Sequence, residues 1–148
     1  MTQFNQHIDF MNGYRIDYPV DWQCRQISPT QMGFYAPPEN SVDAFSENVT
    51  VGMEYTPQSL DQYIEFQVAQ MQTIGGFQLI SRNESYLANL PGQKLEFSGH
   101  MGPAMLQLLV AVILKNKLAL IVTYTAQANA YNKYMPIVDA MLNSLKLN

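Results

Sequence analysis

The sequence predicts an α+β protein in which helices pack against a central, mainly antiparallel sheet. Three observations favour this class. Strand-like segments follow one another through short turns, one hairpin is apolar on both faces, and amphipathic helices stand in the middle and at the end of the chain. A chain of 148 residues, 47% hydrophobic and 14% charged, suits one core. We expect a single domain over residues 1–148, with residues 1–12 its least defined segment.

The first well-marked strand lies in GYRIDYPVDW, residues 13–22. Aromatic and aliphatic side chains alternate there with Arg15 and Asp17, which predicts one core-facing side. Pro19 removes a backbone donor and begins a turn. We expect this turn to deliver Trp22 into one end of the core.

Two further strands show the same alternation. NVTVGMEY at 48–55 and QKLEFSGH at 93–100 each place apolar residues on one face and polar residues on the other. A turn at LPG, residues 90–92, is expected to join the second of them to FQLISRNESYL at 77–87.

A helix is predicted in SLDQYIEFQVAQMQTIGG, residues 59–76. Ser59 followed by Gln62 forms a capping box, in which each side chain accepts a hydrogen bond from a backbone N–H of the other residue. Gly75 and Gly76 permit the left-handed exit. The residues that share its apolar stripe are Leu60, Ile64, Val68 and Met71.

The closing helix lies in YNKYMPIVDAMLNSLKLN, residues 131–148. Because proline is tolerated at a helix start, Pro136 predicts a first turn close to Asn132. Its apolar face comprises Tyr134, Val138, Met141, Leu142 and Leu145.

Between these helices stands the most apolar segment, MLQLLVAVIL at 105–114, followed by LALIVTYTA at 118–126. The first run has about ten residues, half of what a membrane-spanning helix needs. The polar turn between the runs centres on Asn116, which tolerates positive φ. Neither run alternates, so we expect a hairpin at the centre of the sheet with both faces covered.

Charge and cysteine content exclude some classes of protein. A net charge of -4 without a basic cluster argues against nucleic acid as a partner. The lone Cys24 cannot form an intrachain disulfide and is read as a buried, inert thiol. The chain has neither a transmembrane segment nor a signal-like start. It is expected in the cytoplasm if Met1 is the natural start, and in the periplasm or at a membrane anchor if a signal segment was removed.

The sequence carries no catalytic, metal or cofactor motif, so we expect neither an enzyme nor a bound cofactor. His7, in the N-terminal segment, and His100, beside Gly99 in the glycine-rich turn GHMGPAM, lie outside any nucleophile motif and are expected in solvent. The histidines and Cys24 lack the spacing of a zinc site. The acidic loop PPENSVDAFSEN lacks the pattern of a calcium loop.

The loop from Pro37 to Glu47, about a dozen residues long, exceeds the usual connection, and such loops are often functional. Phe45 either packs beneath the loop as its own small core or anchors a partner. The candidate partner-binding residues of this loop are Glu39, Asp43, Phe45 and Glu47.

GYRIDYPVDW resembles the opening motif of PsbP-like domains, a glycine, a short strand, Tyr-Pro and a nearby Trp. The similarity continues through FYAPPENSVDAFSENVTV, SLDQYIEFQ, LPGQKLEF, TYTA and YNKYMPIVDAMLNSL, from about Gly13 to Leu145. The resemblance implies the α/β/α sandwich of PsbP and of Mog-type Ran-binding proteins, and a binding or assembly role without established catalysis. Many bacterial members carry a signal or lipid anchor, which this start does not show.

We therefore expect a non-catalytic module whose partner is another protein. One alternative is a chaperone-adaptor that shields an apolar segment of a secreted protein, and another is a small-molecule-binding protein or enzyme using the GHMGP turn. A homodimer is also expected to be possible, if two helices do not cover both faces of the central hairpin.

Overall fold

The computed structural model describes residues 2–39, 45–73 and 75–148. The strands of this part of the chain are β1 (Phe4–Asp9), β2 (Tyr14–Pro19), β3 (Gln23–Ser28), β4 (Gln31–Tyr35), β5 (Asn48–Tyr55), β6 (Gln78–Leu87), β7 (Leu90–Met101), β8 (Ala104–Lys115), β9 (Leu118–Gln127) and β10 (Lys146–Leu147). Its helices are α1 (Leu60–Thr73) and α2 (Tyr131–Ser144).

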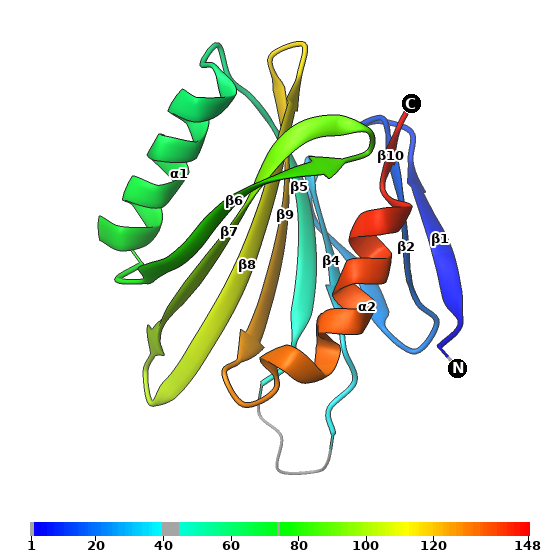
Figure 1. Cartoon of the computed structure of the whole chain (residues 1–148). Coiled ribbons are helices and arrows are strands. Elements are labelled where there is room, and N and C mark those ends of the chain that lie inside the picture. Colours follow the sequence, from blue (N-terminus) through cyan, green and yellow to red (C-terminus); the bar gives the residue numbers. More distant parts are fainter. Residues whose placement is uncertain (1, 40–44, 74) are drawn as a thin grey trace.

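The strands form two sheets. The main sheet has the order β3-β4-β5-β9-β8-β7-β6, and the small sheet has the order β1-β2-β10. Every pairing between the described strands is antiparallel, so the α+β class with a mainly antiparallel sheet is confirmed. Figure 1 shows the small sheet and both marked chain ends on one side of the molecule, with α1 on the other.

The β8–β9 hairpin lies inside the main sheet and is buried on both faces, as predicted. Val110 and Val112 belong to one core cluster, and Leu109 and Ile113 belong to another on the opposite face. The turn adopts positive φ at Asn116 (53°) and at the next residue, Lys117 (65°). Such a turn matches the twist of the strands that it joins.

Helix α1 covers one face of the hairpin through the predicted apolar stripe, which packs with Tyr63 against β7 and β8. The capping box is present: Gln62 N–H donates to Ser59 Oγ (3.2 Å), and Ser59 N–H donates to Gln62 Oε1 (3.1 Å). Gly76 has a φ of 68°, which places the predicted left-handed residue beyond the helix end.

Polar contacts fix α1 against β6 and β7. Gln93 is buried, and its Nε2 donates to Asp61 Oδ1 on the helix (3.1 Å), while its Oε1 accepts from Arg82 Nε (2.8 Å). Arg82 also forms an ion pair with Glu65 of α1. The buried amide therefore has partners on both sides, which its burial requires.

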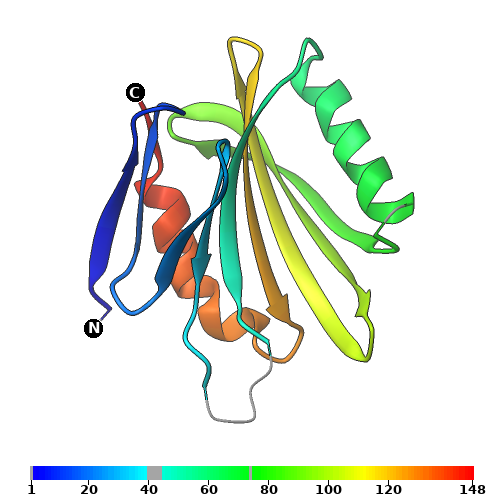
Figure 2. The same cartoon turned by 180° about the vertical axis from the view of Figure 1, so that it is seen from behind.

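Helix α2 and the small sheet cover the opposite face. The predicted apolar face of α2 packs into a cluster with β2, β4, β5, β8 and β9. In Figure 1 this helix stands in front of β4 and β5, and in the reverse view of Figure 2 it stands behind them. Trp22 is buried in the same cluster, edge-to-face with Tyr134 at 6.0 Å, as the opening motif predicted.

Some expectations about these elements were wrong. Helix α2 begins at Tyr131, near the predicted residue. Pro136, however, lies in its second turn, where the backbone hydrogen bond to the carbonyl of Asn132 is lost. The prediction that the helix lies within residues 131–148 is confirmed, and the chain after α2 forms the additional strand β10. Residues 4–9 form β1, so His7 lies in a strand and packs near the rings of Tyr14 and Phe34 instead of facing solvent.

The turn between β6 and β7 was also misplaced. Ala88 (φ 51°) and Asn89 (φ 63°) form the turn, and Leu90, Pro91 and Gly92 belong to β7. Pro91 pairs with Tyr86 of β6, and β7 pairs with β8 only from Gly92 onward, so Pro91 lies just outside the β7–β8 ladder, where proline is tolerated. Gly92 is required for packing: a Cβ there would collide with the carbonyl oxygen of Val112 and the side chain of Ile113.

Gly92→Ala should therefore destabilise the protein by about 1–3 kcal/mol, the usual cost of overpacking a core. Asn89→Gly is the matched control, because glycine adopts positive φ without strain. Urea unfolding measures both. A Gly92→Ala variant as stable as wild type would contradict the close contact between β7 and β8.

His7 predicts a pH dependence of stability. Burial lowers the pKa of His7 below its ordinary value of 6.5, and Asp9 opposes this only in part. The unfolded chain therefore binds a proton at His7 more readily than the folded protein does. Protonation of His7 does not reduce the free energy of unfolding above pH 6.5, and reduces it progressively as the pH decreases below 6.5. His7→Phe should flatten this fall in melting temperature, whereas His100→Gln, at an exposed position, should retain it. An unchanged slope in His7→Phe would refute the assignment.

Candidate functional site

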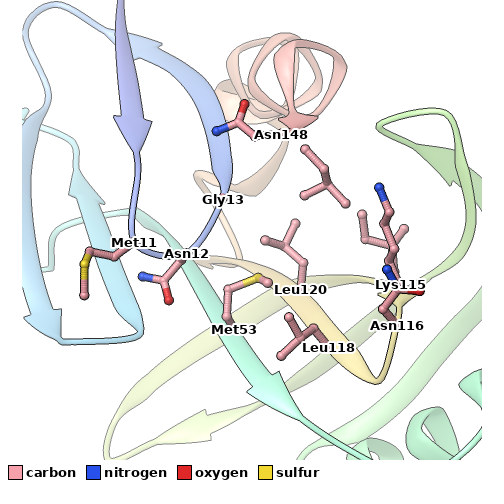
Figure 3. Close-up of a pocket in the computed structure, with 11 residues that line it drawn as sticks. Met11, Asn12, Gly13, Met53, Lys115, Asn116, Leu118, Leu120 and Asn148 are labelled. Carbon is pink, nitrogen blue, oxygen red and sulfur yellow. The ribbon is translucent and has the colours of Figure 1, made fainter.

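An apolar cleft of about 290 Å³ opens between the small sheet and the β8–β9 hairpin. Figure 3 shows Met11 and Asn12 on one side of it and Lys115 and Asn116 on the other. Met53 and Leu120 lie between them. The remaining residues that line the cleft are Gly13, Ile113, Leu118, Leu147 and Asn148.

One wall of the cleft is the turn between β1 and β2, which its own hydrogen bonds hold in place. Asp9 accepts from the backbone N–H of Asn12 (2.9 Å) and from its side-chain amide (3.0 Å). The same amide donates to the carbonyl of Pro29 (3.0 Å), and Gly13 has a φ of 75°. Partial burial alone would raise the pKa of Asp9, but the bonds from Asn12 outweigh it and lower that pKa.

The opposite wall is the β8–β9 turn, and the chain end at Asn148 lies above the cleft (Figure 3). Leu147 pairs with Tyr14, and Asn148 N–H donates to the carbonyl of Gly13 (2.9 Å). Residues from both ends of the chain thus meet the central hairpin at one end of the molecule.

Exposed apolar side chains lie at or next to the cleft: Met11 and Leu118 line it, and Phe10 and Tyr55 are their neighbours in the chain and across the sheet. Phe10 and Met11 are 85% and 93% exposed, and Tyr55 and Leu118 are 64% and 45% exposed. Tyr55 and Leu118 are direct partners across β5 and β9, so they stand side by side on the face that carries the cleft. We call these four residues the apolar rim.

The chemistry of the cleft is that of a binding site. Among the described residues that line it, Lys115 is the one with a charged side chain. The amide of Asn116 supplies donors and an acceptor, and Asn12, whose NH2 group is used within the turn, supplies its side-chain oxygen. Neither histidine of the chain lines it, nor does Cys24. An apolar lining with a few polar groups at the margin is typical of sites that bind a ligand.

The predicted partner-binding loop lies elsewhere, and only part of it is described. Glu39 accepts a hydrogen bond from Lys133 Nζ (2.6 Å) and another from the hydroxyl of Tyr134 (3.2 Å), both on α2. Glu47 is buried and accepts from the backbone of Gln127 (3.2 Å). Phe45 is partly buried against the α1 side of the core, and Asp43 lies outside the described residues. Partner binding by this loop stays a prediction.

The remaining chemical groups lie apart. His100 is exposed in β7, while Cys24 is half-buried against the core, where burial raises the pKa of its thiol. Residues 2–39, 45–73 and 75–148 bring together no group of three metal-binding side chains. Within the same ranges, no helix combines the length and the apolarity that crossing a membrane requires.

Little in the sequence indicates this cleft. Its walls come from residues as distant as Met11, Lys115 and Leu147, which only the tertiary fold brings together. The available signal was local: Phe10 and Met11 are apolar residues in a turn next to Asn12-Gly13, where polar residues are usual. This signal marks an exposed apolar site without saying what surrounds it.

Three solved structures share the fold over nearly their whole length. Cyanobacterial PsbP (CyanoP) from Synechocystis sp. PCC 6803 has a TM-score of 0.74 at 12% identity, covering 100% of this chain and 94% of its own. LpqN of Mycobacterium tuberculosis, involved in cell envelope biogenesis, has a TM-score of 0.74 at 13% identity, covering 99% and 91%. The Saccharomyces cerevisiae Ran-binding protein Mog1p has a TM-score of 0.69 at 10% identity, covering 99% and 96%.

At these identities the likeness establishes the fold, and the resemblance to PsbP-like domains is confirmed. No curated protein matches the sequence. A family model does match, over residues 16–144, which run from β2 to the end of α2. The chain therefore belongs to the DcrB family.

Proposed function

We propose that this protein is a non-catalytic binding module that holds an apolar segment of another protein in the cleft. The observation that carries the proposal is the apolar rim, which continues the lining of the cleft onto the surface. Contiguous exposed apolar surface is unfavourable in water and marks interaction sites. At the rim, Met11 is 93% exposed, although the fold has a core that could bury such residues.

The lining suits a protein segment whose sequence can vary. Met11 and Met53 are unbranched and polarisable, so they adapt to side chains of different shape. Asn12 and Asn116 stand on opposite walls. The Asn116 amide can pair with the backbone of an inserted segment, whereas the NH2 group of Asn12 already donates to Asp9 and Pro29 and leaves only its side-chain oxygen for a ligand. Lys115 adds a positive charge that favours a segment carrying an acidic residue.

The comparisons support a binding role in general terms. Mog1p is named as a Ran-binding protein, and LpqN is described as involved in cell envelope biogenesis.

A single domain over residues 1–148, arranged as an α/β/α sandwich, belongs to the same proposal. It is supported by the packing of α1 and α2 on opposite faces of the main sheet. The compartment in which the protein works stays a prediction.

A chaperone-adaptor that shields an apolar segment of a secreted protein would use the same cleft, and would differ in accepting many segments instead of one partner. Small-molecule binding at the GHMGP turn has less support. Gly102 (φ 60°) lies in the tight β7–β8 turn, next to the exposed Met101. A homodimer is not needed to cover the β8–β9 hairpin, because one chain buries both of its faces.

Site-specific photocrosslinking tests the proposal. We expect p-benzoylphenylalanine in place of Met11 to crosslink a protein in an extract of the source organism, because this side chain is exposed beside the cleft. Leu118→Gln in the same protein should reduce the yield about tenfold, since an apolar contact of a leucine is worth about 1.5–3 kcal/mol.

The matched control carries the crosslinker in place of Met101, which is 62% exposed in β7, beside the β7–β8 turn. One crosslinked species through position 11 would favour a specific partner, and a broad distribution would favour the chaperone-adaptor. Equal crosslinking from both positions, or none from position 11, would refute binding at the cleft.

A further inference from the structure

A second hollow, of about 380 Å³, lies on the other face of the main sheet, between α1 and the strands β4, β5 and β9. We call it the polar groove, because hydroxyl and amide side chains dominate its lining. It shares only Met53 with the apolar cleft among the described lining residues. The residues that line it are Thr30, Gln31, Thr50, Gly52, Met53, Glu54, Tyr63, Gln67, Gln70, Ile121 and Thr123.

The floor of the groove is set by strand register. Thr50 and Thr123 are direct partners across β5 and β9, so their hydroxyls stand side by side. Gly52 pairs with Gln31 on β4 and leaves the floor without a side chain at that point. A Cβ on Gly52 would stand in ordinary van der Waals contact with the flexible Gln31 side chain (Cγ at 3.4 Å) and near the carbonyl of Thr30 (3.9 Å), so the floor at Gly52 has room for a methyl group.

Several polar groups of the groove are not used by the fold. Among the described residues, the side chains of Gln31, Gln70, Thr50 and Thr123 have no hydrogen-bond partner, whereas other polar side chains near α1 are paired. Hydroxyls and amides can each donate and accept. Thr50 and Thr123 are only half-exposed, so a ligand that replaces their water must offer both kinds of group.

The charge of the groove narrows the ligand further. Glu54 is the one charged residue among the described residues that line it, and its Oε2 accepts from the hydroxyl of Tyr63 (2.7 Å). Burial and this carboxylate raise the pKa of Tyr63, which keeps the hydroxyl protonated and the bond in place. With a carboxylate and no cationic side chain in its lining, the groove disfavours phosphate and carboxylate ligands.

We propose that the polar groove binds a neutral saccharide. A sugar ring presents several hydroxyls that both donate and accept, which matches the paired threonines and the glutamine amides. Ile121 gives the floor one apolar side chain for the C–H face of the ring. The volume lies within the range of roughly 300–1,000 Å³ that is usual for small-ligand sites. A peptide strand could not add there, because β4, β5 and β9 are each paired on both sides.

Amide NMR of the ¹⁵N-labelled protein tests this site separately from the cleft. The probes are glucose, galactose, N-acetylglucosamine, maltose and cellobiose, added one at a time to millimolar concentration. At least one of them should shift the amides of Thr50, Gly52 and Thr123 without shifting those of Leu118 and Leu147. A glutamine-rich peptide, added in a separate titration, represents the alternative class of ligand, because its side-chain amides also donate and accept hydrogen bonds.

Gly52→Ala and Thr50→Val should each weaken the sugar's binding, by about tenfold, through filling the floor or deleting a hydrogen bond. Both should remain folded, since the added Cβ at Gly52 has room. Thr125→Val is the matched control, on the same strand face of β9 but outside the groove. The proposal is overturned if no sugar shifts these amides, if only the peptide does, or if Gly52→Ala binds as wild type.

Discussion

The structure depends on burying both faces of the β8–β9 hairpin. Val112 and Ile113 point to opposite faces and are 0% and 1% exposed. Each such side chain contributes about 1.5–3 kcal/mol when it leaves water. A hairpin of this composition is stable only if separate elements cover its two faces. The rest of the chain supplies them, α1 on one face and α2 with the small sheet on the other.

Each cover reaches over only part of the sheet, and both candidate sites lie where a cover ends. Helix α1 packs against β6 and β8, so the face of β4 and β5 beside it is left for the polar groove. Helix α2 packs against β2 and β9, and none of its residues lines the apolar cleft, which lies between the small sheet and the end of the hairpin. The two hollows thus follow from a sheet wider than the elements that cover it.

Patterns of neighbouring residues predicted the elements well. The capping box of Ser59 and Gln62, the stripe of α1 and the turn at Asn116 each depend on residues within a few positions, and the structure contains all three. The turn before β7 was misplaced because Pro91 and Gly92 are typical turn residues, whereas the requirement for Gly92 comes from the distant Val112. β10 was missed because two residues form a strand only when β2 is there to pair with them.

The sequence predicted the candidate sites less well than it predicted the strands and helices, because the sites also depend on residues that are distant in the sequence. Glu47 was expected on a binding surface, but it is buried where Gln127, distant in the sequence, donates a hydrogen bond to it. The cleft likewise requires Met11, Leu118 and Leu147 to meet, and no local pattern encodes that meeting. The sequence does contain apolar residues in turns, where polar residues are usual. Phe10 is an example, and the structure shows that it is exposed.

Selective ¹³C labelling of the methionine methyl groups would test the central claim, that the cleft and its rim are the surface that contacts a partner. Met11 reports on the cleft alone, Met53 on both the cleft and the polar groove, Met101 on the far end of β7, and Met141 on the core. On addition of the partner-containing fraction of an extract, we expect the signals of Met11 and Met53 to shift or broaden while those of Met101 and Met141 stay unchanged. Perturbation centred on Met101, with Met11 and Met53 unaffected, would contradict it.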